Sequence, residues 1–273
     1  MKKVFSNPLV AIGLVIIASI MLLALIAPLI APYDPDAFNV NAILLPPSYS
    51  HLMGTDGLGR DVLSRMLYGA RISLMVGFVA VGIATIIGII LGAIAGFYRG
   101  WVDTLIMRLV DVMLSIPSFF LILAVIAFLT PSIWNIMIVI GLTSWMGVAR
   151  LVRAEFLSLR HREFILAAQA LGAKDARLIF MHLLPNSLTP IIVSSILGIA
   201  SAVLLESGLS FLGLGVQAPQ ASWGNILTDG KEYIQFAWWL SLFPGLAILM
   251  TVLGYNLLGD GLRDAYNPRS NHS

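Results

Sequence analysis

The sequence predicts an all-α membrane protein that crosses the bilayer six times. Hydrophobic residues make up 59% of the 273 positions, charged residues only 11%, and the mean hydropathy is +0.93. Soluble domains carry about 25% charged residues, so this composition indicates an integral membrane protein. Several apolar runs are long enough to span a bilayer, and a dense polar island at 150–186 separates the fourth run from the fifth.

The predicted spans are apolar segments bounded by polar or Pro- and Gly-rich sequence. The first, 9–31, exceeds the apolar core of a signal peptide, so we expect an uncleaved helix after a cytoplasmic segment 1–8. Residues 73–258 form a core domain of five further spans, and 259–273 form a polar tail. Within the core the spans are predicted at 73–97, 104–129, 133–148, 187–205 and 236–258.

The distribution of Lys and Arg predicts the orientation. On this topology eleven of them lie in the terminal and inner segments, four lie outside, and Arg108 is embedded in a span. Because Lys and Arg are enriched on the cytoplasmic side, both termini and the island 150–186 are expected there.

The segment 32–72 is polar and rich in Pro and Gly, so we expect an extracytoplasmic loop. Residues 60–67 within it have two helical faces, an apolar one of Val62, Leu63, Met66 and Leu67 and a polar one of Arg60, Asp61, Ser64 and Arg65. This pattern predicts a short helix on the outer membrane surface. Trp223 and Trp238-Trp239 are expected nearby as an aromatic belt.

The island 150–186 is expected to be an aqueous loop with its own helical structure, because charge this dense cannot lie in hydrocarbon. Residues 162–171 are rich in helix formers, and Gly172 suits the end of that helix. Asp175 lies early in a second helix, where its charge is favourable, and Pro185 is predicted to end it. The island therefore indicates a docking surface for a cytosolic partner, with an ordinary amphipathic loop as the alternative.

Three further features lie inside the predicted spans or at their ends. Gly88, Gly92 and Gly96 repeat every four residues, so they share one face and permit close approach of another helix. Arg108 and Asp111 lie three residues apart, close enough to pair, and are candidates for a translocation pathway or for charges that reach the inner interface. Glu206, near the outer end of the fifth span, is either a pathway carboxylate or a hydrogen-bonded structural one.

The residue inventory excludes several kinds of chemistry. The chain has no Cys and only four scattered His, without the spacing of a metal site, so no metal is expected. It has no nucleotide-binding motif, so we expect ATP and Mg²⁺ on partner subunits and no cofactor on this chain. No catalytic constellation is visible within the spans, so no catalytic residues are expected.

The island also carries a recognisable pattern. Ala167-Ala168, then Gly172, then Leu184-Pro185, resembles the cytoplasmic signature of binding-protein-dependent ABC import permeases. In that family this segment is a coupling helix that docks in a groove of the ATP-binding subunit. The first position of the signature is usually Glu and is Leu166 here. The ATPase-coupling residues implied by the resemblance are Glu163, Leu166, Ala167, Ala168, Gly172, Ala173, Asp175, Leu184 and Pro185.

The resemblance extends over nearly the whole chain. The motifs are Asn7-Pro8, Ala31-Pro32-Tyr33-Asp34-Pro35, Gly54-Thr55-Asp56-x-x-Gly59-Arg60-Asp61, Tyr68-Gly69-Ala70-Arg71, Leu209-Ser210-Phe211-Leu212-Gly213-Leu214-Gly215 and Ser222-Trp223-Gly224. Their order is similar to the second, C-type subunit of dipeptide, oligopeptide and nickel permeases. This implies a type I ABC importer fold in a bacterial inner or plasma membrane, with 73–258 as the core permease domain.

The resemblance further implies partners and cargo. The partners are a homologous permease subunit that completes a heterodimer, two cytoplasmic ATP-binding subunits, an extracytoplasmic substrate-binding protein and membrane lipid, with no nucleic acid. The cargo is di- or oligopeptide, and the alternative is the same machinery importing nickel, metal–chelate complexes or glutathione. An ATP-independent channel or secondary transporter would need its own coupling-ion site, which is not visible.

Overall fold

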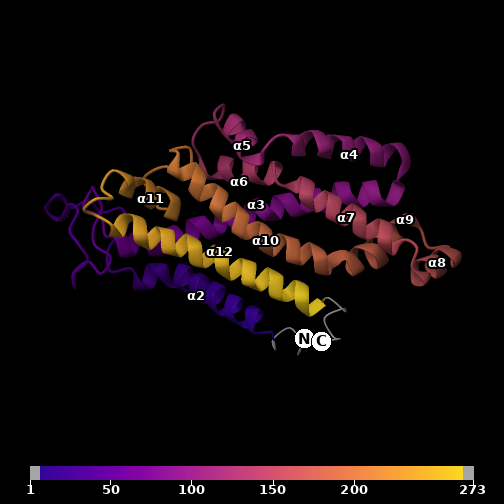
Figure 1. The fold of residues 1–273 in the computed structure, drawn as a ribbon, viewed down its shortest axis with the longest axis horizontal. Helices are drawn as coiled ribbons and strands as arrows, with labels where there is room; N and C mark the ends of the chain where they lie inside the picture. The colour runs from indigo at the N-terminus through magenta and orange to yellow at the C-terminus, as the bar shows by residue number, and fades with distance from the viewer. Residues whose placement is uncertain (1–6, 267–273) are drawn as a thin grey trace.

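The computed structural model describes residues 7–266 and consists of long helices joined by short segments (Figure 1). Its helices are α2 (Pro8–Ile30), η1 (Val40–Ala42), α3 (Val62–Tyr98), α4 (Gly100–Ser115), α5 (Ser118–Ile126), α6 (Ile133–Leu142), α7 (Trp145–Leu159), α8 (Glu163–Ala170), α9 (Asp175–Arg177), η2 (Leu178–Leu183), α10 (Leu184–Phe211), α11 (Trp223–Lys231) and α12 (Trp239–Tyr266). In the described part of the chain, five helical segments are long and apolar enough to cross a membrane, and the bent pair α4 and α5 is a sixth candidate. This agrees with the six crossings expected from the sequence.

Helix α3 lies at the centre of the bundle. It contacts α7, α10, α6 and α2, while α2 also packs along α12. Figure 1 shows α8 and α9 projecting at one end of the bundle, toward which the start of α2 and the end of α12 also point. The segment between α2 and α3 and the short helix α11 lie at the opposite end. The segments expected on the inner side thus lie together at one end of the bundle, and those expected on the outer side lie at the other.

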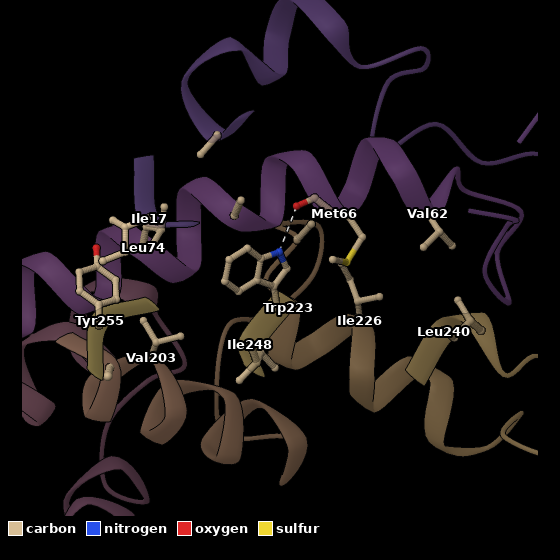
Figure 2. Packing of buried hydrophobic residues seen from close by; sticks show 14 of the residues in the cluster. Ile17, Val62, Met66, Leu74, Val203, Trp223, Ile226, Leu240, Ile248 and Tyr255 are labelled. Carbon is tan, nitrogen blue, oxygen red and sulfur yellow. Dashed lines mark hydrogen bonds between the residues drawn. The ribbon is translucent and has the colours of Figure 1, made fainter. Parts of the chain in front are cut away.

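The largest core lies near the end that carries α11 (Figure 2). Trp223 packs there among residues of α3, α10, α11 and α12, and its indole Nε1 donates to the carbonyl of Met66 at 3.1 Å. Trp239 Nε1 donates to the carbonyl of Thr55 at 3.0 Å. Both indoles are buried, whereas Trp238 is half exposed. The expected aromatic belt is therefore wrong for Trp223 and Trp239, which are core residues.

The interfacial helix expected at 60–67 is not a separate element. Val62 onwards forms the first turns of α3, a single helix of 37 residues, with Asp61 as its N-cap. Arg60 and Arg65 are buried together with the apolar face, because Asp56 and Asp229 pair with them. The apolar face of residues 60–67 therefore packs into the apolar core, and the polar face packs into an ionic cluster. The two faces do not lie against lipid and water.

The predicted third span is broken where the sequence contains Pro117. Helices α4 and α5 meet at 85° around Ile116 and Pro117. Ile116 is extended, as expected for a residue before proline, and the hydroxyl of Ser115 donates to the carbonyl of Val112. The span expected at 104–129 therefore consists of two helices that meet at a sharp bend.

The boundaries of the polar island also differ from the prediction. Residues 150–159 are not aqueous loop but the second half of α7, which continues the fourth span to Leu159. Their arginines pair with carboxylates on α4. The prediction, which used charge density alone, therefore placed the start of the loop too early in the sequence.

Pro185 does not end the second island helix, because α9, η2 and α10 run on without a break from Asp175 to Phe211. Residues 178–183 form a π-helical segment, whose wider turn makes room for the proline ring. The amide nitrogen Nδ2 of Asn186 donates to the carbonyl of His182, and Ser187 Oγ donates to that of Leu183. Side chains thus donate hydrogen bonds to backbone carbonyls at the junction between η2 and α10.

Candidate functional site

The projecting segment 160–177 contains α8, a tight turn and α9. The turn has the hydrogen bonds of a Schellman motif. The amide of Ala173 donates to the carbonyl of Ala168 at 3.0 Å, and the amide of Gly172 donates to that of Gln169 at 2.9 Å. Gly172 has a φ of +79°, a conformation that residues with a Cβ rarely adopt. The motif Ala-Ala-x-x-x-Gly-Ala therefore has the residue spacing of this type of helix end.

The small residues of the motif have different environments. Ala168 and Ala173 are half-buried and meet across the turn, against the apolar cluster below it. Ala167 and Gly172 are exposed, and a Cβ at Gly172 would meet no atom within 4 Å. Glycine is therefore favoured at 172 by backbone conformation and not by lack of space.

A buried cluster fixes this segment to the spans. Ile165 of α8 is buried against Phe156 of α7 and against Leu178 and Leu183 of η2. Because η2 continues directly into α10, these close-packed contacts join α8 to two spanning helices.

The outer face of the segment is apolar and uncovered. Leu166 is 51% exposed and Leu171 89% exposed, with Phe164 beside them. Glu163 and Asp175 are also exposed, each in the first turn of its helix, where a carboxylate is favourable. At the far end of the motif Leu184 is half-buried and Pro185 is exposed. Such a face is typical of a surface that a protein partner covers.

Two arginines in and at the end of α7 bind α4 and α3. Arg153 donates to both carboxylate oxygens of Asp103, at 2.5 and 2.6 Å. Arg160 donates to the carbonyl of Phe97 at 2.7 Å, near the end of α3, where carbonyls lack helical partners. These contacts stabilise the base of the projecting segment. The sequence did not reveal them, because the partners are separated by 50 and 63 residues.

The predicted pairing of Arg108 with Asp111 is wrong. Asp111 instead accepts from Arg150 Nη2 at 2.5 Å, and Arg108 is exposed on the same helix. Residues three positions apart on one helix can pair, but the partner of Asp111 is Arg150 on the neighbouring helix α7.

Glu206 is fully buried between α3, α10 and α11. Hydroxyls of Ser210, Ser222 and Ser73 donate to its carboxylate at 2.7, 2.9 and 3.3 Å. Of the two roles that the sequence left open, this geometry supports the hydrogen-bonded structural carboxylate.

The glycines of α3 lie against α7. A Cβ at Gly88 would lie 2.5 Å from Val148 Cβ, and one at Gly92 would lie 2.5 Å from the carbonyl oxygen of Ala149. At Gly96 it would lie 2.7 Å from Phe156 Cβ. The contact between these helices thus needs glycine at all three positions.

An ionic cluster that the sequence did not reveal lies at the opposite end. Arg60 Nε donates to Asp56 at 2.7 Å, and Arg60 Nη2 donates to Asp229 of α11 at 3.2 Å. Arg65 Nη2 lies 3.6 Å from the same Asp229 oxygen. Burial raises the pKa of Asp229, and the positive charges of Arg65 and Arg60 oppose that rise. The cluster joins the segment before α3 to the segment before α12.

Comparison with known families assigns this architecture. Residues 88–272 match the family described as binding-protein-dependent transport system inner membrane component, and residues 1–47 match the N-terminal TM domain of oligopeptide transport permease C. This chain belongs to the binding-protein-dependent transport permeases. It is a C-type subunit of that family and a multi-pass protein of the bacterial inner membrane, as the sequence motifs predicted.

Named relatives of this permease align over almost its whole length. It is 48% identical to the dipeptide transport system permease protein DppC of Alkalihalophilus pseudofirmus, over 98% of this chain and 88% of that protein. It is 40% identical to the oligopeptide transport system permease protein OppC of Bacillus subtilis, also over 98% and 88%.

Solved structures give the fold of this permease. The MetNI methionine ABC transporter in an inward-facing conformation aligns with a TM-score of 0.60 at 18% identity, over 73% of this chain and 95% of the other. An amino acid ABC transporter aligns with a TM-score of 0.51 at 16% identity, over 74% and 92%. The fold is therefore that of the type I ABC importer permeases, as predicted.

Proposed function

We propose that this permease is the C-type membrane subunit of an ATP-driven importer of di- and oligopeptides. The observation that carries the proposal is the projecting segment 160–177, with its apolar uncovered face above a buried anchor. The relatives named as dipeptide and oligopeptide permeases support the choice of cargo.

Coupling follows from how this segment is attached. An ATP-binding subunit that covers Leu166 and Leu171 moves α8 when it closes. Ile165 transmits that movement to α7 and to η2, and through η2 to α10. The spans then tilt as packed units, which alternates access to a central path. Leu166, where the family signature usually has Glu, makes this contact apolar.

The complete importer contains a homologous permease as heterodimer partner, two ATP-binding subunits and an extracytoplasmic binding protein. Both termini and the projecting segment lie in the cytoplasm, and the distribution of Lys and Arg supports this orientation. The binding protein then docks at the opposite end, on 32–72 and 207–235, where the Arg60–Asp229 cluster holds the two segments together. This chain catalyses no reaction, and ATP and Mg²⁺ bind to the partner subunits.

The test is purification of the tagged chain from its native membrane in mild detergent, followed by mass spectrometry of what accompanies it. We expect a second permease and ATP-binding subunits, and a copurifying binding protein whose extracted ligand is a peptide. A binding protein loaded with nickel, a metal chelate or glutathione would contradict the peptide assignment. Purification without any ATP-binding subunit would contradict the importer assignment.

A further inference from the structure

Helix α4 has a polar face that its neighbours leave uncovered. Every residue of this face is exposed, at spacings of three and four positions along the helix: Thr104, Arg108, Asp111 and Ser115, which we name the α4 stripe. Val110, on another side of the helix, is fully buried against the bundle. The stripe therefore points away from the core of this chain.

The α4 stripe reaches the depth of the bilayer centre. Trp101, the second residue of α4, is 77% exposed and has the exposure and type of an interfacial aromatic. Asp111 lies ten residues further along, a rise of roughly 15 Å in a hydrocarbon core of roughly 30 Å. Figure 1 shows α4 running alongside α7 and α3, so this rise is measured along the bundle.

A half-exposed ion pair lies at that depth. Arg150 Nη2 donates to Asp111 Oδ1 at 2.5 Å, and their side chains are 52% and 57% exposed. Charged groups of this exposure are costly against lipid, and in membrane proteins such groups face the protein interior or water. The α4 stripe and Arg150 therefore do not face lipid in the assembled protein.

A hollow lies against α7 within about one turn of Arg150. Ser144, the N-cap of α7, and Gly147 are exposed, as Arg150 is, and they line a cavity of about 210 Å³. Hydroxyls of Thr85 on α3 and Ser194 on α10 line the same cavity. A Cβ at Gly147 would meet no atom within 4 Å, so the α7 side of the cavity is open.

We infer that the α4 stripe and Arg150 form this chain's side of a water-filled path, and that the Asp111–Arg150 pair is a subsite for the charged ends of a peptide. The inference rests on the proposed function and assigns its pathway to particular residues. A peptide with free termini carries one ammonium and one carboxylate. Asp111 matches the first, and Arg150 with the nearby Arg108 matches the second. Because the pair is half exposed, a passing peptide exchanges partners with it without leaving a charge unpaired.

Accessibility of single cysteines tests the water-filled path. The chain contains no Cys, so each variant adds one known thiol to it. Thr104→Cys and Ser115→Cys lie on the stripe, while Leu105→Cys and Leu109→Cys lie on the adjacent apolar face of α4 and are also exposed in the isolated chain. The assembled complex in nanodiscs is treated with a charged methanethiosulfonate, and labelling of this chain is measured by mass spectrometry.

We expect label at Thr104→Cys and Ser115→Cys and none at the two leucine positions. Equal protection of all four thiols would overturn the inference, because the stripe would then be covered by the partner permease. Labelling does not depend on transport. It therefore tests whether the stripe faces water even where the complex imports no peptide. Failure of wild-type uptake would instead contradict the proposed function.

Two ion pairs between the same helices provide a matched comparison for the subsite. Asp111→Asn disrupts the pair on the stripe, and Asp103→Asn disrupts the Arg153 pair nearer the cytoplasmic end. At saturating binding protein loaded with dialanine, we expect Asp111→Asn to lower dipeptides imported per ATP hydrolysed about tenfold, the loss of one charged hydrogen bond. Asp103→Asn is expected to lower thermal stability and leave that ratio unchanged. The same ratio for both variants would overturn the subsite.

Discussion

The amide of Ala173 donates to the carbonyl of Ala168 across the turn that Gly172 makes in the left-handed conformation. This bond closes α8 and joins it to the chain that becomes α10. The geometry explains why the motif contains two small residues five positions apart with a glycine just before the second. A larger side chain at either alanine would separate the turn from the cluster around Ile165.

The first prediction separates conformation from charge at Gly172. Gly172→Val places a β-branched residue at φ +79°, at a cost of about 1–2 kcal/mol, whereas Gly172→Asn adopts that conformation more readily. We expect Val to uncouple peptide-stimulated ATP hydrolysis and Asn to retain most of it. Gly172→Asp, isosteric with Asn, adds a negative charge at the apolar face and is expected to couple less well than Asn. Normal coupling in Gly172→Val would show that the turn does not transmit movement.

The second prediction concerns the contact between α3 and α7. A methyl group at Gly92 would lie 2.5 Å from the carbonyl oxygen of Ala149, whereas one at Gly82 on the same helix meets nothing within 4 Å. Gly92→Ala is expected to destabilise the complex by about 1–3 kcal/mol through overpacking. Gly82→Ala is the control and should leave stability unchanged or slightly raised. Equal melting temperatures for the two variants would contradict the close packing of these helices.

The third prediction concerns Glu206. Glu206→Leu removes the acceptor of three buried hydroxyls, at about 1–3 kcal/mol for each group left unpaired. Glu206→Gln keeps one carbonyl acceptor, and the hydroxyls can turn to accept from its amide, so its loss is expected to be smaller. Transport per folded complex should be unchanged in both. A fall in uptake by Glu206→Gln at full stability would instead restore the pathway role.

The fourth prediction is a pH dependence. Because burial raises the pKa of Asp229, the folded protein holds this proton more tightly than the unfolded chain does. The stability associated with this group is therefore fully present below its ordinary pKa of about 4 and is lost as pH rises through the raised value. Asp229→Asn should remove that decline. The measurement is the difference in melting temperature between wild type and variant, which should change as pH rises. A difference that does not change with pH would contradict the raised pKa of Asp229. The control is Asp34→Asn, because Asp34 is an exposed carboxylate.

The sequence predicted well what depends on composition and local spacing. Hydropathy gave six crossings, and the glycine after Leu171 gave the end of α8. The four-residue spacing of Gly88, Gly92 and Gly96 indicated a shared face but not its partner, because only the fold brings α7 there.

What the sequence could not predict depends on contacts between distant segments. Arg150 and Arg153 suggested an aqueous loop because their carboxylate partners on α4 precede them by 39 and 50 residues. In the same way, Arg60 and Arg65 suggested an interfacial helix, because Asp229 lies on α11. Charge patterns along one helix do not reveal a partner on another.

Uptake of radiolabelled dialanine into proteoliposomes tests the central claim most directly. The vesicles contain this chain with its partner permease and ATP-binding subunits, and the peptide-loaded binding protein is added on the outer side. We predict uptake that requires ATP on the cytoplasmic side, is not supported by a sodium or proton gradient alone, and is lost in Gly172→Val. Uptake without ATP, or undiminished uptake by that variant at full assembly, would contradict the account.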